Sequence, residues 1–213
     1  MSSESKKGSF LDLYHKRWFN ILNNLFLAGM YVFMVVAMVE NYIETHEISS
    51  LLIIFFEAII IILVLARRKP KEFTYSIDEW FYAFAGTMAP LLLRPVLDAN
   101  DSLILEAILI SGIIIYLFGA VSLGRSFGVV PANRGVKTSG LYKFVRHPVY
   151  FGYAVTYIGF VSQHLSLRNI IVITVFFLFQ ALRIVCEEEF LSKDKEYREF
   201  KKKTRWRLIP FVW

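Results

Sequence analysis

Six long apolar runs restrict the fold of this 213-residue chain more than any other feature. They cover residues 21–39, 51–66, 80–96, 103–123, 149–165 and 170–185. A helix that crosses the hydrocarbon core of a bilayer needs about 20 apolar residues, within a range of about 17–25. Backbone groups in lipid must be satisfied within the segment, and these runs are too long for barrel strands. The pattern therefore predicts an all-α integral membrane protein.

Basic residues are concentrated on one side of the predicted membrane region. The N-terminal segment, the loops after the second and fourth runs, and the C-terminal tail contain 21 of the 24 lysines and arginines. The opposite loops carry acidic residues instead, namely Glu40, Glu44, Glu47, Asp98 and Asp101. Because loops rich in Lys and Arg stay in the cytoplasm, this bias predicts about six spans with both termini cytoplasmic. A five-span alternative would place the tail, with its eight basic residues, on the opposite side.

The predicted domain organisation has three parts. They are a cytoplasmic N-terminal segment at residues 1–20, a four-helix membrane region at 21–123, and a region with the polar motifs at 124–213. The last part is expected to contain a helical hairpin over residues 149–185. A cytoplasmic interfacial helix should follow, with Trp206 and Trp213 as anchors, because aromatic rings favour the membrane–water boundary.

Two features interrupt the apolar runs. Pro90 and Pro95 are expected to kink the third helix, because proline removes a backbone N–H and clashes with the preceding turn. Glu57 lies midway along the second run. A proton-transfer or substrate group and a carboxyl group hydrogen-bonded inside the bundle fit this position equally well, so Glu57 receives no assigned role.

The composition restricts the possible chemistry. Cys186 is the single cysteine, which excludes an internal disulfide and a cysteine-based metal cluster. The net charge of +6 is typical of a membrane protein with a basic cytoplasmic face, and no RNA- or DNA-binding motif accompanies it. No group of His, Cys and acidic residues has metal-ligand spacing. We therefore expect no metal and no nucleic-acid partner, we infer no obligate protein partner, and the polar residues 1–20 predict no cleavable signal peptide.

Two polar clusters bracket the predicted hairpin. The first is Arg146-His147-Pro148-Val149-Tyr150-Phe151-Gly152, and the second is Arg183 with Glu187-Glu188-Glu189. If the hairpin crosses the bilayer and returns, both clusters end at the same water–lipid boundary. Ionisable groups at such a boundary cost free energy unless they pair or bind a ligand. The two clusters therefore predict one shared site.

The local spacing of these residues supports a site but leaves alternatives open. Proline favours the first turn of a helix, which places His147 near the N-cap and Tyr150 on the same helix face. The histidine could equally be structural, and the tyrosine could belong to the aromatic belt of the membrane. Gly152 allows a neighbouring helix or a ligand to approach closely. Arg183 and Glu187 share a helix face, as site residues or as an ordinary ion pair.

The stretch 124–142 has a different character from the apolar runs around it. It is rich in glycine and turn-forming residues, and it contains basic side chains. Exposed backbone amides beside basic groups suit an anionic or carboxylate-bearing ligand. The alternative is an ordinary cytoplasmic loop whose basic residues contact lipid headgroups.

Residues 135–213 resemble the isoprenylcysteine carboxyl methyltransferase and phospholipid methyltransferase group of integral membrane enzymes. The resemblance rests on Thr138-Ser139-Gly140-Leu141-Tyr142, the first polar cluster, Arg183-x-x-x-Glu187-Glu188, and the tail Glu196-Tyr197-Arg198-Glu199-Phe200 with Pro210. It implies S-adenosyl-L-methionine as methyl donor, in a cytoplasm-facing pocket roofed by the C-terminal segment. It also implies a lipophilic or lipidated acceptor that arrives from the bilayer and presents a carboxylate, a thiol or an amine.

The resemblance also implies roles for individual residues. The residues expected to line the cofactor site are Val136, Lys137, Tyr142, His147, Pro148, Tyr150 and Glu187. Arg183 would face the acceptor and orient it. Glu187 or Glu188 would take the proton of an amine acceptor, so the candidate catalytic residues are Arg183, Glu187 and Glu188.

Departures from the family pattern keep other functions open. Ser192-Lys193-Asp194-Lys195 replaces a familiar Phe-Gly, and Phe200 stands where a second tyrosine is common, so a prenylated protein is not inferred as the substrate. Membrane sterol and steroid reductases, which bind NADPH, share the Arg-His-Pro-x-Tyr-x-Gly stretch but usually have an acidic residue where Tyr153 stands. An NADPH-dependent reductase and a non-catalytic membrane binding protein are therefore the alternatives to a methyltransferase.

Overall fold

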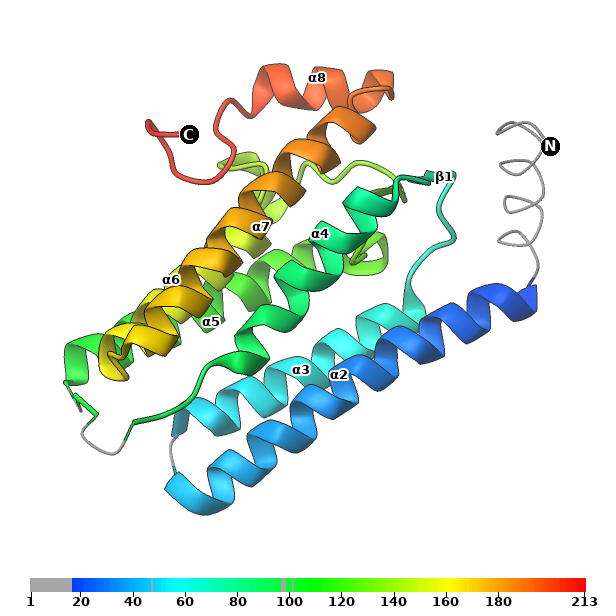
Figure 1. Cartoon of the computed structure of the whole chain (residues 1–213). Coiled ribbons are helices and arrows are strands. Elements are labelled where there is room, and N and C mark those ends of the chain that lie inside the picture. Colours follow the sequence, from blue (N-terminus) through cyan, green and yellow to red (C-terminus); the bar gives the residue numbers. More distant parts are fainter. Residues whose placement is uncertain (1–16, 47, 97–98, 101) are drawn as a thin grey trace.

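The computed structural model describes residues 17–46, 48–96, 99–100 and 102–213 (Figure 1). Predictions that concern segment 1–16, Glu47, Asp98 and Asp101 lie outside the described residues. The α-helices are α2 (Arg17–Thr45), α3 (Ile48–Ala66), α4 (Ile77–Met88), α5 (Leu103–Leu123), α6 (Pro148–Gln163), α7 (Leu167–Leu191) and α8 (Lys195–Lys203). The short elements are the strands β1 (Glu72–Phe73) and β2 (Ala132–Asn133) and the 3-10 helices η1 (Ala89–Leu92), η2 (Gly124–Ser126) and η3 (Gly140–Lys143).

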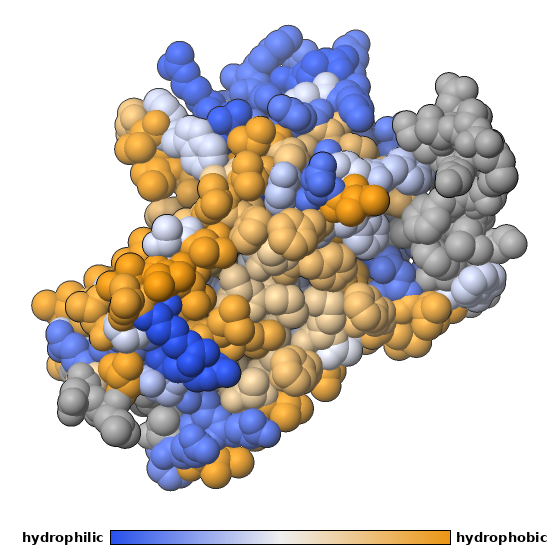
Figure 2. All heavy atoms as spheres, viewed as in Figure 1, coloured by the Kyte–Doolittle hydropathy of each residue, from blue (hydrophilic) through white to orange (hydrophobic). Residues whose placement is uncertain are grey.

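Each of the six apolar runs forms a helix, but the helices differ in length. Within the described residues, three segments are long and apolar enough to cross a membrane, namely Asn20–Glu44, Leu103–Ser126 and Leu167–Leu191. A shorter apolar helix covers Leu51–Ala66. Large apolar side chains such as Phe33, Ile62 and Phe118 are exposed on these helices, as expected where lipid covers them. Figure 2 shows hydrophilic residues gathered at the end that carries α8 and hydrophobic residues over the helices below. The helical membrane character of the chain is confirmed.

The helices alternate in direction (Figure 1). β1, the stretch between α5 and α6, and α8 lie at one end of the bundle. The turns that follow α2, η1 and α6 lie at the other end. The basic residues after α3, after α5 and in the tail are therefore collected at one end of the bundle.

The third apolar run ends as a helix earlier than predicted. α4 ends at Met88, η1 follows, and Leu93 is already extended with φ −63° and ψ 147°. Pro90 cannot donate a helical hydrogen bond, and Pro95 disfavours the helical conformation of Arg94. The two prolines therefore terminate the helix, and the expectation of a kinked helix through residue 96 was wrong.

Helices α5 and α6 pack with their backbones in close contact. A Cβ atom at Gly152 would collide with the backbone of Tyr116, and one at Gly159 would lie 2.7 Å from the backbone nitrogen of Leu109. Small residues allow such close approach of two helices. The prediction that Gly152 makes room for a neighbouring helix is confirmed, and this packing fixes the start of α6, where the first polar cluster lies.

Candidate active site

A cavity that is partly open to solvent lies between the end of α7 and the stretch that joins α5 to α6. The residues predicted for the site that line this cavity are Val136, Lys137, Tyr142, His147, Tyr150, Arg183 and Glu187. Pro148 and Glu188 are not among its lining residues. Pro148 instead starts α6, directly after His147 in the N-cap position.

Tyr150 joins the two charged residues of α7 that face the cavity. Its hydroxyl donates a hydrogen bond of 2.6 Å to Glu187 Oε2. The guanidinium carbon of Arg183 lies 4.9 Å from the centre of its ring. Among the described residues no ion pair joins Arg183 to Glu187, so the alternative of an ordinary intrahelical pair was wrong. The tyrosine ring separates the positive and the negative group, and Glu187 Oε1 has no hydrogen-bond partner among the described residues.

Arg183 is held in place from two other elements. Its Nη2 donates to the carbonyl oxygen of Val129 at 2.5 Å, and its Nη1 donates to the Thr87 hydroxyl at 3.4 Å. The residue is 6% exposed, and its buried Nε has no partner in the described part of the chain. A buried charged donor without an acceptor is costly. The geometry therefore leaves one donor of Arg183 available for a ligand in the cavity.

Glu188 lies on the side of α7 that faces the C-terminal tail. Its carboxylate accepts from Arg146 Nε at 2.6 Å and from Arg207 Nε at 3.0 Å. His147 Nε2 lies 3.1 Å from the same group, and Lys201 Nζ lies 3.5 Å from it. The Glu188 side chain is only 2% exposed. This carboxylate is therefore enclosed by basic groups. His147 was expected to point toward a ligand, but one of its ring nitrogens contacts Glu188 instead.

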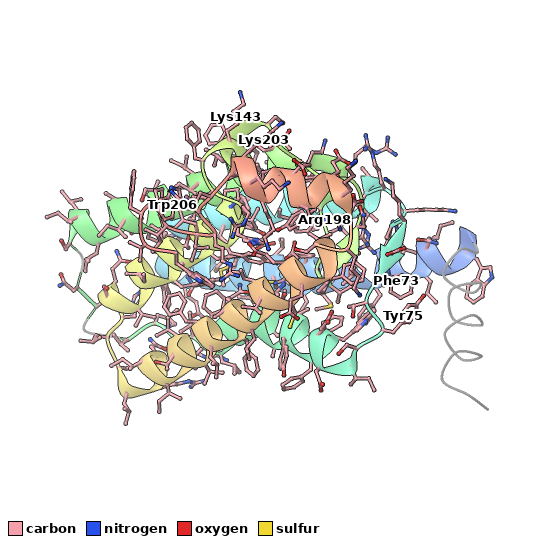
Figure 3. The ribbon with its side chains drawn as sticks, turned by 90° about the horizontal axis from the view of Figure 1, so that it is seen from above. Phe73, Tyr75, Lys143, Arg198, Lys203 and Trp206 are labelled. Atoms are coloured by element: carbon pink, nitrogen blue, oxygen red, sulfur yellow. The ribbon has the colours of Figure 1, made fainter. Side chains whose placement is uncertain are left out.

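We call residues 192–213 the C-terminal lid, because they cover one side of the cavity. Figure 3 shows α8 lying across the ends of the other helices, with Arg198 and Lys203 on it and Trp206 in the segment that follows. The lid is fastened at the start of α6, where Arg146 Nη1 donates to the carbonyl oxygens of Thr204 (2.9 Å) and Arg205 (2.6 Å).

The two buried aromatic residues of α8 face the protein. Tyr197 and Phe200 pack with Tyr142 and line the cavity. The Tyr197 hydroxyl is buried and has no hydrogen-bond partner among the described residues. Burial raises the pKa of the Tyr142 and Tyr197 phenols, and the nearby carboxylate of Glu187 raises both further, so both remain neutral donors. The predicted helix in the tail is thus present, with its aromatic side chains turned to the cavity.

The glycine-rich stretch is anchored by segments distant in sequence. β2 pairs with β1 in antiparallel register, with Glu72 opposite Asn133. The Asn133 amide donates to Asp194 Oδ2 at 2.6 Å, which ties the stretch to the N-cap of α8. This donation and the backbone N–H of Glu196 hold the pKa of the Asp194 carboxyl below its usual range. The β1–β2 pairing therefore holds the cavity wall in place, and the hydrogen bond from Asn133 to Asp194 joins this wall to the lid.

Several lining residues carried no recognisable signal in the sequence. Tyr31 of α2 and Thr87 of α4 come from apolar helices, and nothing in their local pattern marks them as site residues. Tyr197 was noted only as part of the tail, although its place in the family-like motif was a usable signal. Glu57 is 3% exposed and does not line the cavity, and its Oε2 has no hydrogen-bond partner among the described residues.

Comparison with known proteins finds a family model that is similar to the region around this site. A model of the isoprenylcysteine carboxyl methyltransferase (ICMT) family matches residues 103–193. The match covers 91 of the 213 residues. It contains both polar clusters, and it begins with α5, earlier than the resemblance over residues 135–213 suggested. No curated protein matches the chain. This match supports methyl transfer by a membrane protein.

Proposed function

We propose that this protein is an S-adenosylmethionine-dependent methyltransferase that acts on a lipophilic acceptor at the membrane surface. The observation that carries the proposal is the arrangement of Glu187 and Arg183 on either side of Tyr150, in a cavity covered by the lid. The family match supports methyl transfer. The charges in the cavity suit a ligand that carries both signs.

The groups in the cavity fit the methyl donor. The open oxygen of Glu187 suits the ammonium group or the ribose hydroxyls of the donor. The rings of Tyr142 and Tyr150 suit the adenine or the cationic sulfur, because aromatic faces attract cations. The Tyr197 hydroxyl, buried without a partner among the described residues, supplies a further polar contact. The second ring nitrogen of His147 has no hydrogen-bond partner among the described residues, and with nearby backbone amides it suits the carboxylate.

The acceptor side of the proposed site is the wall that contains Arg183. Tyr31 and Thr87 lie on the same wall and come from helices with apolar surfaces, which suits an acceptor that enters from lipid. The Arg183 Nε donor would orient a carboxylate or thiolate. Such acceptors need no general base. For an amine, Glu187 would take the proton, because Glu188 is enclosed by Arg146 and Arg207.

The protein's contribution to the reaction is mainly alignment and exclusion of water. When bound, S-adenosylmethionine supplies a methyl carbon activated by positive sulfur. Arg183 holds the acceptor, Glu187 and the tyrosines hold the donor, and the lid keeps water from the line between them. Glu188 then acts as a positioning residue, since its contacts fix Arg146, His147 and the lid.

A calorimetric titration of the purified protein tests the cofactor. S-adenosylmethionine and its demethylated product should bind, and NADPH should not. Glu187→Gln should weaken binding about tenfold or more, because a hydrogen bond to a charged group contributes about 1.5–3 kcal/mol. Glu189→Gln is the matched control, since this neighbouring acid is exposed and outside the cavity. Preferential binding of NADPH would favour a reductase, and binding without methyl transfer would favour a non-catalytic protein.

The proposal places the cavity and both termini on the cytoplasmic side of six membrane-crossing helices. In a Cys186→Ser background, a membrane-impermeant thiol reagent should label cysteines introduced at Lys143 and Lys203 from the same side. A cysteine at Arg168, at the opposite end of α7, should react only from the other side. Labelling of positions 143 and 203 from opposite sides would contradict this topology.

A further inference from the structure

A small apolar surface is exposed at the end of the bundle that carries the lid. Phe144 is 67% exposed, and in the turn over residues 208–213 Phe211 is 86% and Val212 is 74% exposed. Ile209 in the same turn is also exposed, and we call these four residues the apolar corner. Figure 2 shows hydrophobic residues beside the hydrophilic end, at the place where Figure 1 draws this turn. None of the four lines the active-site cavity, so methyl transfer does not explain their exposure.

Hydrogen bonds hold the turn beside the start of α6. The backbone N–H groups of Arg146 and His147 donate to the carbonyl oxygens of Trp206 and Arg207, both at 2.9 Å. His147 is the N-cap of α6. The turn therefore lies against the end of the helix bundle and does not extend away from it.

Helix α5 places Phe144 at the same level. The 3-10 helix η3 leads to Phe144 and begins at Gly140, where a Cβ atom would collide with the side chain of Ser122. Ser122 lies near the end of Leu103–Ser126, a segment long and apolar enough to cross a membrane. The apolar corner therefore lies where this segment ends, which is the cytoplasmic membrane–water boundary of the topology proposed above.

Helix α8 and the two tryptophans are less suited than the corner to contact lipid. The exposed positions of α8 are charged, namely Lys195, Glu196, Arg198, Glu199, Lys202 and Lys203. Trp206 is half-buried, with its ring centre 5.2 Å from that of Phe211. The ring centre of Trp213 lies 5.2 Å from the guanidinium carbon of Arg207. The most exposed apolar groups are thus Phe211 and Val212, rather than the tryptophans that the sequence suggested as anchors.

The backbone directs the Phe211 ring outward. Its φ is 67°, in the left-handed region that residues other than Gly, Asn and Asp rarely adopt. The turn is closed by the carbonyl oxygen of Trp213, which accepts from the backbone N–H groups of Arg207 and Leu208, both at 2.9 Å. A disfavoured conformation that exposes a large apolar ring points to a contact outside the chain.

Exposed cations flank the corner, namely Lys143, Lys203 and Arg205. The structure shows no ion pair for any of the three among the described residues. The Thr204 hydroxyl donates to the carbonyl oxygen of Tyr142 at 3.1 Å, which brings the two lysines close together (Figure 3). Neither 139–149 nor 200–213 contains an acidic residue. The charge around the corner therefore suits an anionic surface.

We infer that the apolar corner docks into the cytoplasmic surface of an anionic bilayer and so fastens the lid beyond α8. Apolar and aromatic side chains beside Lys and Arg suit the membrane interface, where the rings meet acyl chains and the cations meet phosphates. Arg146 Nη1 already binds the carbonyl oxygens of Thr204 and Arg205, directly before the turn. Lipid contact on the other side of this segment would hold the lid closed over the cavity. The inference rests on the proposed topology.

Spin labels in nanodiscs of phosphatidylglycerol and phosphatidylcholine test the depth of the corner. The labels are attached to Val212→Cys and, as a control, to Lys202→Cys on the charged side of α8, each in a Cys186→Ser background. The label at position 212 should collide more with oxygen than with a water-soluble nickel reagent, and the label at 202 should show the reverse. Equal access of the nickel reagent to both positions would overturn the docking.

Trypsin digestion of the full chain in the same nanodiscs tests the effect on the lid. The test variant is Phe211→Asn/Val212→Thr, because Asn tolerates the left-handed conformation and Thr keeps the shape of Val. The matched control, Leu103→Asn/Ile104→Thr, changes two exposed apolar residues at the opposite end of the bundle. The lid of the test variant should be cleaved at least about tenfold faster than that of the wild type or the control, since burial of one large apolar side chain accounts for such a factor.

The lipid composition and the copy number separate the possible partners. The wild-type lid should be cleaved faster in discs of phosphatidylcholine alone, because the cations then lose their anionic partners. Equal cleavage of the test and control variants would overturn the role of the corner. Protection seen only in discs with two copies of the protein would assign the corner to a contact between copies and overturn the bilayer as its partner. Neither readout involves methyl transfer, so failure here leaves the proposed activity untouched.

Discussion

Replacement of Glu188 by Gln tests whether this carboxylate fastens the lid. The substitution keeps the shape of the side chain and removes the charge that Arg146, His147 and Arg207 share. The lid should then detach more readily from the start of α6, while Glu187 and its bond to Tyr150 stay in place.

The structure sets the expected magnitude. Removal of one partner from a buried ion pair costs about 3–5 kcal/mol. Two features reduce the cost here, because Arg146 keeps its bonds to the carbonyl oxygens of Thr204 and Arg205, and the Arg207 side chain is 31% exposed to water. We therefore expect a loss of about 3 kcal/mol in the free energy of unfolding. For a chain of this size that corresponds to a Tm about 6–12 °C lower.

Thermal unfolding in detergent measures the global effect, and limited trypsin digestion measures release of the lid, which contains many lysines and arginines. Glu189→Gln is the matched control, because it removes the same charge from the neighbouring exposed position of α7. The reasoning is refuted if Glu188→Gln and Glu189→Gln melt within about 1 °C of each other and are cleaved in the lid at the same rate.

Three further predictions concern the helix packing, the cavity and the lid. Gly152→Ala should lower the unfolding free energy by about 1–3 kcal/mol, because its Cβ collides with Tyr116, whereas Gly29→Ala should be neutral or slightly stabilising in thermal melts. Tyr197→Phe should leave the Tm unchanged and weaken binding of S-adenosylmethionine about five- to tenfold in calorimetry, since the hydroxyl has no described protein partner. The pKa of Asp194 is lower in the folded protein than the ordinary Asp value of about 4 in the unfolded chain. Its contribution to the stability of the lid is therefore complete above about pH 4, and it is lost as the pH falls through the lowered pKa. Hydrogen exchange of α8 amides should show this loss in the wild type and not in Asp194→Asn.

The helices could be predicted from the sequence because their cause is local. An apolar run must satisfy its own backbone hydrogen bonds in lipid, and each of the six runs forms a helix, although the third is no longer helical after Leu92. The ends of two of these helices differ from the predicted bounds. α7 extends to Leu191, beyond the predicted end at residue 185, because the charged residues that follow are accommodated by the cavity and the lid. α4 stops at Met88, because Pro90 cannot donate a helical hydrogen bond and Pro95 disfavours the helical conformation of Arg94.

The site could be predicted in part. The motif spacing and the expected hairpin placed His147, Tyr150, Arg183 and Glu187 together, and the structure brings all four to one cavity. Tyr31 and Thr87 could not be found, because an apolar helix carries no local mark of the side that faces a cavity. The pairing of β1 with β2 was equally hidden, since two residues per strand leave no periodic pattern.

Glu187 and Glu188 show most clearly what the sequence alone could not decide. Their chemistry is identical and they are adjacent, so the sequence determined that two carboxylates end the last apolar helix and that they meet the Arg-His-Pro motif at the same boundary. Neighbouring residues of a helix point about 100° apart. What each one meets depends on segments between 19 and 42 residues away. Only the tertiary structure therefore decided that Glu187 faces Tyr150 and the cavity while Glu188 holds the lid.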